Sequence, residues 1–413
     1  MAHNVIAEAG KCLNCKKPMC VAGCPVSTPI PHFIPAFLNG KIEEAGKMLF
    51  ENNPLSLVCS IVCNHASQCQ GHCVKGIKGE PVEISTIERF ISERYLDSLS
   101  PQPVPGNGIK VAVVGSGPAG ITIAIKLAGF GYDVTIFESK TDMGGVLRFG
   151  IPEFRLPKEI VERYKELMYA LGIKIKFNVT IGRTFQIEDL FRDGFRAISI
   201  GTGVTWPVPL NVKGETLANV HYGVHFLERP GKYRLGKSMI VIGGGNVAMD
   251  VARTAMRMGV RDVKVVMRSD RCTANIEERE YAGIEGAQFI FNKAPDEICE
   301  DGVYFRDTVC DENHKVMSVS QERTLMKADT VMICVSQRPS KLILTQTDKI
   351  EVDGRGLVKT DGQGETTYPG VFASGDIVRG AKTVAEAVET SKRVACAIHE
   401  YLQKNYSSGA AIV

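Results

Sequence analysis

The chain has 413 residues, which corresponds to about two to four domains of ordinary size. Its 44% hydrophobic and 23% charged residues exclude a chain that is mainly disordered. The 49 basic and 46 acidic side chains leave a net charge of +3, so we expect no nucleic acid and no membrane surface as a partner. No apolar run approaches the roughly 20 residues of a spanning helix, and the first residues lack the regions of a signal peptide. We therefore expect a cytoplasmic protein.

Cysteine is concentrated at the start of the chain: eight of the 13 cysteines lie within the first 73 residues. In a cytosolic chain such a block indicates a metal or cluster site before it indicates disulfides. Clustered thiolates hold iron–sulfur clusters or zinc, so two structural zinc sites are the alternative to two clusters. The block contains two groups of four, which are Cys12, Cys15, Cys20 and Cys24, then Cys59, Cys63, Cys69 and Cys73.

Helical patterns accompany the cysteines. Apolar residues at amphipathic spacing predict one helix that runs from Pro35 through Leu49 and a second helix over residues 84–99. Residues 100–108 hold three prolines and two glycines, a composition that is typical of a linker. These patterns predict a helical N-terminal domain that ends at the linker.

A dinucleotide-binding unit follows the linker. An apolar strand over residues 110–114 leads into a glycine turn, a helix to about residue 129, and a strand over residues 133–137 that ends at Glu138. Such glycines allow a tight turn and a close approach of the pyrophosphate, and the acid binds a ribose hydroxyl. A glycine turn in an unrelated α/β fold is the alternative. The turn residues are Gly115, Ser116, Gly117, Pro118, Ala119 and Gly120.

A second unit of the same type begins 128 residues later. A strand over residues 239–242, a glycine turn, a helix to about residue 258 and a strand over residues 263–267 repeat the arrangement. The second strand ends at Arg268, which either meets a 2′-phosphate or is a solvated surface residue. Two units imply two nucleotides, and a flavin with a nicotinamide is the economical pair because a hydride passes between them. The turn contains Gly243, Gly244, Gly245, Asn246, Val247 and Ala248.

Several motifs together resemble the two-dinucleotide-binding flavoprotein superfamily. They are the segment 111–120, Gly144-Gly145, Thr202-Gly203 and the segment 371–376. The resemblance implies an α/β fold in which a helical iron–sulfur domain (residues 1–105) precedes a Rossmann-like FAD domain (106–205 and 340–413) with an inserted Rossmann-like NAD(P)H domain (206–339). Beyond the first turn and Glu138, it implies FAD contacts at Gly145, Val146, Arg155, Gly375, Asp376, Thr383 and Val384. It implies NAD(P)H contacts at Gly243, Gly244, Gly245, Asn246, Val247, Arg268, Ser269 and Arg271.

Residues 53–63 and 150–157 resemble the electron-input half of dihydropyrimidine dehydrogenase. They are also similar to the small subunit of glutamate synthase and to the large subunit of electron-bifurcating transhydrogenases. The resemblance implies two [4Fe–4S] clusters, with Cys59 as a spare buried residue and Glu88 in the place of a non-cysteine ligand. The alternative uses all eight cysteines and leaves Glu88 solvated. The implied ligands are Cys12, Cys15, Cys20 and Cys73 for cluster one, and Cys24, Cys63, Cys69 and Glu88 for cluster two.

The same resemblance implies an electron-entry flavoprotein. NAD(P)H reduces FAD, and the clusters pass single electrons to an FMN- or iron–sulfur-containing partner subunit, with pyrimidine (uracil or thymine) reduction as the leading expectation. Glutamate synthase-like and bifurcating subunits are the alternatives, and a self-sufficient disulfide reductase or a non-enzymatic redox sensor is disfavoured. The run Arg268-Ser269-Asp270-Arg271 leaves NADPH and NADH both open. We name no acid–base residue, because the cofactors perform the chemistry.

Overall fold

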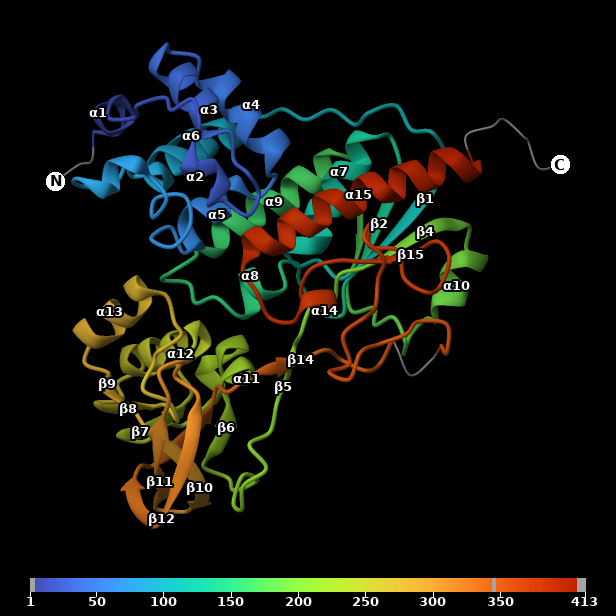
Figure 1. Cartoon of the computed structure of the whole chain (residues 1–413). Coiled ribbons are helices and arrows are strands. Elements are labelled where there is room, and N and C mark those ends of the chain that lie inside the picture. Colours follow the sequence, from blue (N-terminus) through green and yellow to red (C-terminus); the bar gives the residue numbers. More distant parts are fainter. Residues whose placement is uncertain (1–3, 344–346, 407–413) are drawn as a thin grey trace. The chain divides into compact units, whose positions relative to one another are not determined.

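The computed structural model describes residues 4–343 and 347–406 (Figure 1). The chain forms two compact units. The first comprises residues 1–147, 153–204 and 339–413, and the second comprises residues 148–152 and 205–338. The predicted α/β fold, with an N-terminal helical domain and two Rossmann-like domains, is confirmed. No helix in the described ranges is long and apolar enough to cross a bilayer.

The N-terminal part of the first unit is helical. Helix α6 packs against α4 and α5 (Figure 1), and fully buried side chains such as Phe33, Leu49 and Ile87 form its core. The predicted helix over residues 84–99 is confirmed as α6. The elements are α1 (Val5–Gly10), α2 (Met19–Ala22), α3 (Ile30–Leu38), α4 (Ile42–Asn52), α5 (Ser56–Val62), the 3₁₀ helix η1 (Val74–Ile77) and α6 (Ile84–Ser98).

The predicted single helix over residues 35–49 is wrong, because the structure divides it into α3 and α4. The chain turns at Gly40, whose φ of +75° is a left-handed conformation that favours glycine. The amide of Lys41 donates to the Ala36 carbonyl and closes the end of α3. The amphipathic spacing continues across this turn because both helices bury their apolar residues in one core. The periodicity therefore did not reveal the break.

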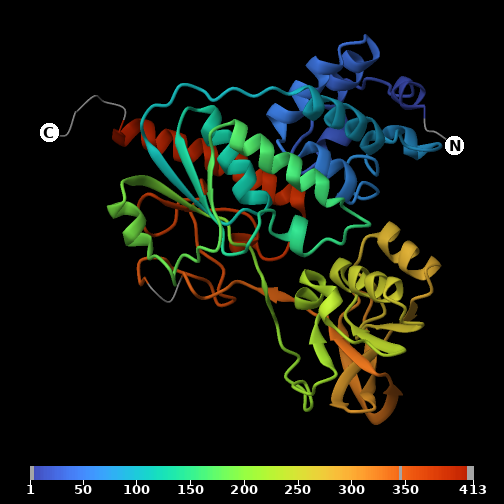
Figure 2. The same ribbon diagram turned by 180° about the vertical axis from the view of Figure 1, so that it is seen from behind.

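The rest of the first unit is a parallel sheet of order β15-β4-β1-β2-β3. Helices α7 and α15 pack together beside it, and both views show this (Figures 1 and 2). Strand β15, from the end of the chain, lies next to β4 and so joins the two halves of the domain. The elements are β1 (Lys110–Val114), α7 (Pro118–Gly129), β2 (Asp133–Phe137), α8 (Val146–Phe149), α9 (Lys158–Ala170), β3 (Lys174–Lys176), α10 (Ile187–Arg192), β4 (Phe195–Ile200), β15 (Val371–Ala373), α14 (Asp376–Arg379) and α15 (Val384–Tyr406).

The second unit has a parallel sheet of order β6-β13-β7-β8-β9 and an antiparallel sheet of β10, β11 and β12. Side chains of β7 alternate: Met239 and Val241 pack toward α12, whereas Ile240 and Ile242 pack toward the antiparallel sheet. The antiparallel sheet was not predicted. The elements are β5 (Trp206–Pro207), β6 (Val220–Tyr222), α11 (Gly223–Glu228), η2 (Pro230–Lys232), β7 (Ser238–Ile242), α12 (Asn246–Arg257), β8 (Asp262–Val266), α13 (Ile276–Ile284), β9 (Gln288–Ile290), β10 (Lys293–Cys299), β11 (Gly302–Cys310), β12 (Val316–Lys327), β13 (Thr330–Ile333) and β14 (Gln337–Arg338).

Candidate cofactor sites

The first glycine turn joins β1 to α7 and is tightly packed. Gly115 has a φ of +96°, which a side chain would strain. A Cβ atom on Gly120 would overlap the Gly115 carbonyl oxygen, and one on Gly145 would lie 2.7 Å from the Gly117 Cα. The backbone of the turn and the backbone at Gly145 therefore lie so close together that only glycine fits at these positions. This arrangement fits the close approach of a pyrophosphate to the N-terminus of α7.

Glu138 closes this turn from the end of β2. Its carboxylate accepts hydrogen bonds from the backbone amide of Ser116 (2.9 Å) and from the Ser116 hydroxyl. The amide of Lys140 (2.8 Å) and the Ser139 hydroxyl (3.2 Å) donate to the other oxygen. Glu138 and Ser116 are both buried. The protein alone thus holds the Glu138 carboxylate in a fixed orientation.

The C-terminal motif lies against the same turn. A Cβ atom on Gly375, whose φ is +74°, would lie 3.1 Å from the Ala119 Cβ. Burial raises the pKa of Asp376 to about 7, although the amide of Lys382 donates to its carboxylate at 3.2 Å. The structure therefore brings the segments 115–120 and 375–376 together, as the resemblance implies.

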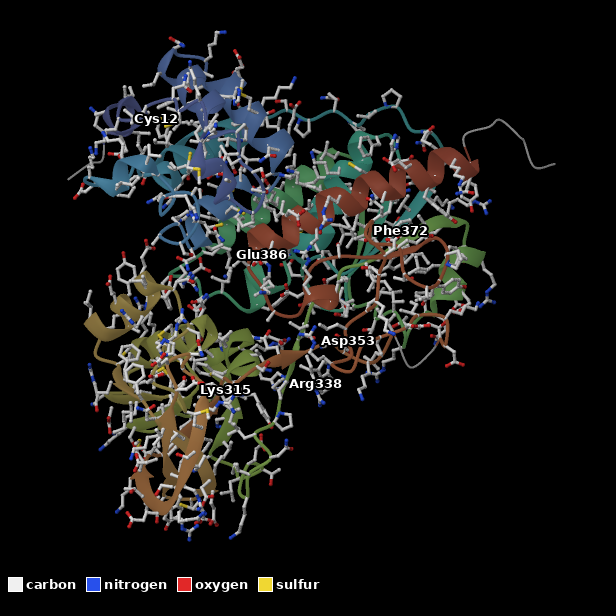
Figure 3. All side chains as sticks on the ribbon, viewed as in Figure 1. Cys12, Lys315, Arg338, Asp353, Phe372 and Glu386 are labelled. Carbon is white, nitrogen blue, oxygen red and sulfur yellow. The ribbon has the colours of Figure 1, made fainter. Side chains whose placement is uncertain are left out.

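Four other predicted FAD contacts lie outside these two segments. Thr383 caps α15: Glu386, labelled in Figure 3, accepts from the Thr383 amide and hydroxyl at 3.1 and 2.8 Å. Val384 is buried at the start of that helix, and Val146 is half exposed at the start of α8. Arg155 is partly buried between α8 and α9. Their roles toward FAD stay predictions.

The second glycine turn joins β7 to α12. Gly243 has a φ of +133°, and a Cβ atom there would overlap the Cys334 carbonyl oxygen. The amides of Thr273 and Ala274 donate to the Gly244 carbonyl at 2.9 and 2.8 Å. Asn246 accepts from the Asn275 amide at 2.8 Å. The loop over residues 272–275 therefore braces this turn, which the sequence did not indicate.

Arg268 follows β8, as predicted, and is exposed. Its side chain has no ion pair within the described ranges, while its carbonyl accepts from the Thr308 hydroxyl at 2.6 Å. The carboxylate of Asp270 lies 2.9 Å from Nδ1 of His314. The hydroxyl of Ser269 donates to the Arg271 carbonyl at 3.3 Å. Arg268 and Arg271 are both exposed, so both cations of this loop are available to a ligand, whereas Asp270 has a neighbour of its own.

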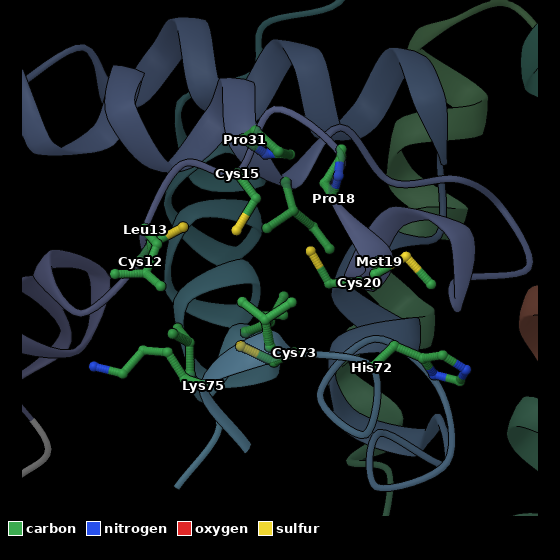
Figure 4. A pocket seen from close by; sticks show the side chains of 14 residues that line it. Cys12, Leu13, Cys15, Pro18, Met19, Cys20, Pro31, His72, Cys73 and Lys75 are labelled. Carbon is green, nitrogen blue, oxygen red and sulfur yellow. The ribbon is translucent and has the colours of Figure 1, made fainter. Parts of the chain in front are cut away.

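The first predicted cluster group surrounds one pocket. Figure 4 shows thiols from the loop before α2, from α2 itself and from the residue before η1 around a common space. No three described His, Cys, Asp or Glu side chains converge as ligands of a single ion do. Burial, followed by the neighbouring Cys73, raises the pKa of the Cys20 thiol to about 11. The four thiols of the pocket are Cys12, Cys15, Cys20 and Cys73.

The second predicted group lies deeper. Burial raises the pKa of Glu88 to about 8, and it also raises the pKa of Cys69, with Glu88 and Cys24 as the next causes. The Cys63 thiol has a raised pKa through Cys59, burial, Glu88 and Cys69. Glu88 contributes to the raised pKa of Cys24, of Cys63 and of Cys69, so the four groups lie near one another. Glu88 is buried and not solvated, which removes one premise of the eight-cysteine alternative.

Comparison with known proteins agrees with this geometry. Residues 109–391 match the model of the pyridine nucleotide-disulphide oxidoreductase family, and residues 1–98 match dihydropyrimidine dehydrogenase domain II, 4Fe-4S cluster. The chain is 33% identical to the NAD-dependent dihydropyrimidine dehydrogenase subunit PreT of Escherichia coli O157:H7, over 96% of this chain and 94% of that one. It is 30% identical to the glutamate synthase [NADPH] small chain of E. coli K12, over 96% and 91%. Mycobacterium tuberculosis FprA in complex with NADPH shares the fold, with a TM-score of 0.61, 19% identity and coverage of 73% and 85%.

The chain belongs to the pyridine nucleotide-disulphide oxidoreductase family. More than half of its length matches the family model, and two curated relatives at 30% identity or more extend over almost all of it. The resemblance to flavoprotein subunits of dihydropyrimidine dehydrogenase and glutamate synthase is therefore confirmed. The chain is an NAD(P)H-dependent flavin and iron–sulfur oxidoreductase subunit.

The second thiol group has the features of a site that a cofactor completes. Glu88 is buried, and no described residue forms an ion pair or hydrogen bond with its carboxylate. A buried carboxylate without a partner is costly. The hydroxyl of Tyr164, from α9, is also buried without a hydrogen bond of good geometry, and its neighbours are the Leu57 backbone, Cys59 and Glu88. Thiolates and a carboxylate suit an iron–sulfur cluster, whose iron supplies the missing positive charge.

The cluster helices are fastened to the FAD domain within the first unit. Lys126 of α7 donates to the Glu51 carbonyl, and Lys392 of α15 donates to the Asn52 side chain at 2.7 Å. Asn52 in turn donates to the Val26 carbonyl at 3.2 Å, two residues from Cys24. Both lysines therefore lie at the C-terminus of α4, where the helix dipole favours cations. Sequence reasoning missed this contact, because residues distant along the chain form it.

Proposed function

We propose that this chain is an electron-entry flavoprotein with two [4Fe–4S] clusters. When bound, FAD accepts a hydride from NAD(P)H and the clusters carry single electrons. The observation that carries the proposal is the grouping of two sets of four candidate ligands in the same compact unit as the first glycine turn. The protein's contribution is to hold these sites together and to exclude water from the deeper one. We also propose the domain boundaries that the resemblance implies: an iron–sulfur domain over residues 1–105, an FAD domain over residues 106–205 and 340–413, and an NAD(P)H domain over residues 206–339.

Cluster two is proposed to use Glu88 rather than Cys59. Both side chains are buried, so burial alone does not distinguish them. Anaerobically prepared protein is expected to contain about eight irons, and Glu88→Ala is expected to lose about four, because one ligand of cluster two is missing. Cys59→Ala is the matched control, with iron content unchanged. Zinc in place of iron would refute the cluster assignment, and the opposite result for the two variants would refute the choice of ligand.

For the nicotinamide nucleotide we propose a modest preference for NADPH. Arg268 is exposed and unpaired in the described ranges, and the Asp270 carboxylate is directed to His314. A charge-assisted contact to a 2′-phosphate contributes about 1.5–3 kcal/mol, so Arg268→Ala is expected to lower kcat/KM for NADPH roughly 10–150-fold and to leave NADH nearly unchanged. Equal losses with the two nucleotides would show that Arg268 does not contact the phosphate.

The partner is proposed to be an FMN- or iron–sulfur-containing subunit that reduces pyrimidines. The support is the name of the 33% identical relative, a dihydropyrimidine dehydrogenase subunit. The test mixes the purified chain, NAD(P)H and uracil or thymine, with and without the candidate subunit. Turnover only with both chains is expected. Turnover by this chain alone would overturn the electron-entry proposal.

We also propose a cytoplasmic location, where thiols remain reduced.

A glutamate synthase partner is the second candidate, favoured by the 30% identity to a glutamate synthase small chain. The same assay with a glutamate synthase large subunit, glutamine and 2-oxoglutarate distinguishes the two. Glutamate formation without pyrimidine reduction would replace the first assignment.

A further inference from the structure

Exposed apolar side chains lie at the first thiol pocket and near it along the chain. Leu13 and Met19 line the pocket and are 63% and 51% exposed, and Figure 4 shows both beside the thiols. Ile77, at the end of η1, is 80% exposed. All three come from the two short loops that also carry the thiols. Exposed apolar side chains that gather in one place are typical of a binding surface.

Lysines flank these apolar residues along the two loops. Lys16 and Lys17 lie between Cys15 and Pro18, while Lys75 and Lys78 lie in and after η1. None of these four lysines forms an ion pair within the described ranges. We call the loops over residues 13–19 and 72–78 the lysine-rimmed face.

The positive charge of this face is local. The first hundred residues contain nine basic and nine acidic residues, so the domain as a whole is neutral. Lys41 and Lys47 on α4 pair with Glu44 and Glu51, at 3.1 and 3.7 Å. Glu8, which precedes the first loop, pairs with Lys11 at 2.6 Å. The two loops themselves contain four lysines and no acidic residue, so the lysine-rimmed face carries a net positive charge.

The pocket is also the more accessible of the two thiol groups. Its four cysteines are all partly exposed, whereas Cys69 and Glu88 of the second group are buried. Electron transfer between proteins requires a short distance between redox centres. A partner that docks at the lysine-rimmed face would therefore lie closer to the first thiol group than to the second.

We propose that the lysine-rimmed face docks an electron-accepting protein whose contact surface is acidic around an apolar centre. Leu13, Met19 and Ile77 would form the apolar contact, and the lysines would attract and orient the partner. This rests on the proposed function. One NAD(P)H supplies two electrons to two one-electron acceptors: NAD(P)H and two oxidised carriers yield NAD(P)⁺, one proton and two reduced carriers.

The test compares two protein acceptors of opposite charge, an acidic rubredoxin and basic cytochrome c, with the intact holoenzyme and NAD(P)H. Lys16→Glu combined with Lys17→Glu is expected to raise KM for rubredoxin at least about tenfold, and KM for cytochrome c is expected not to rise. Added salt is expected to raise KM for rubredoxin in the original protein, because it screens the lysines.

The matched control is Lys41→Glu combined with Lys47→Glu, which changes the net charge equally on α4. Its KM for rubredoxin is expected to change less than about threefold, because these two lysines lie outside the lysine-rimmed face. Ile77→Ser tests the apolar contact and is expected to raise KM for rubredoxin several-fold without loss of iron, since that side chain is mostly exposed. Equal effects of the two lysine pairs, or an unchanged KM in all variants, would overturn the docking proposal.

A separate readout distinguishes this failure from failure of the proposed function. Menadione is a small acceptor that needs no docking surface, and its reduction by NAD(P)H is expected to be the same in all variants. Loss of menadione reduction in the original protein would refute the electron-entry function itself. Normal menadione reduction with identical rubredoxin kinetics in the patch and control variants would refute only the lysine-rimmed face.

Discussion

The two proposed cofactor regions of the first unit differ in how far the protein alone completes them. At the FAD turn, four donors from the chain satisfy the Glu138 carboxylate. At the second thiol group, Glu88 and the Tyr164 hydroxyl are buried without comparable partners in the described residues. Buried polar groups in folded proteins are normally hydrogen-bonded. The comparison indicates that the nucleotide turn is preformed, whereas the cluster region depends on its cofactor for stability.

The largest expected effect is that of iron removal. Chelation of iron from the holoprotein is expected to make residues 4–98 sensitive to protease, because thiols and a carboxylate are then buried without a partner. Removal of FAD is expected to leave the parallel sheet resistant. Limited proteolysis followed by mass spectrometry measures both. Equal protection of the two regions after iron removal would contradict the proposed dependence of the cluster region on its cofactor.

The glycine turn that is proposed to bind FAD is expected not to tolerate a larger side chain. Gly145→Ala places a Cβ atom 2.7 Å from the Gly117 Cα at a φ of +52°, so the turn must shift where FAD is proposed to bind. A strain of about 2–3 kcal/mol corresponds to a loss of FAD affinity of roughly 30–150-fold. Titration of the flavin-free protein with FAD, followed by flavin fluorescence, measures it. Gly129→Ala is the control, since a Cβ atom there has nothing within 4 Å, and a comparable loss in that variant would contradict the explanation.

Asp376 gives the flavin-free protein a pH dependence. Burial raises its pKa from 3.8 to about 7, so the folded state favours the protonated acid. This contribution to stability is present below pH 3.8 and is lost as the pH rises through about 7, at about 1.4 kcal/mol per unit of pKa difference.

The flavin-free protein is therefore expected to unfold at lower urea concentration at pH 8 than at pH 5. Asp376→Asn removes the titrating group and is expected to reduce this difference, while exposed Asp193→Asn leaves it unchanged. An identical pH dependence in Asp376→Asn would show that another group is responsible.

The smallest effect concerns Tyr164. Because its hydroxyl has no regular partner in the described residues, Tyr164→Phe in cluster-free protein is expected to change the free energy of unfolding by less than about 1 kcal/mol, or to raise it. Tyr132→Phe loses a 2.8 Å hydrogen bond to Nδ1 of His399 and is expected to lower the free energy of unfolding by about 1 kcal/mol. Urea unfolding compares the two. A larger loss for Tyr164→Phe would mean that the hydroxyl is satisfied without a cluster.

Local patterns were sufficient for much of the fold. The strands and helices around both glycine turns are confirmed within a residue or two, since a strand, a glycine turn and a helix are adjacent in sequence. The break at Gly40 was missed because both helices contribute to one core and so preserve the spacing. The antiparallel sheet over residues 293–327 was missed because β12 is largely exposed and its pairing with β11 contains register shifts.

By itself, the sequence determined the cysteine content, the two glycine turns and the acid or arginine after each second strand, because these are properties of short segments. Only the tertiary structure decided which thiols share a pocket, since Cys73 reaches Cys12 across sixty residues of helices. It also decided that Glu88 is buried, that Tyr164 of another domain lies near it, and that Lys392 fastens α15 to α4. Burial and long-range proximity depend on how elements pack, and no local spacing encodes them.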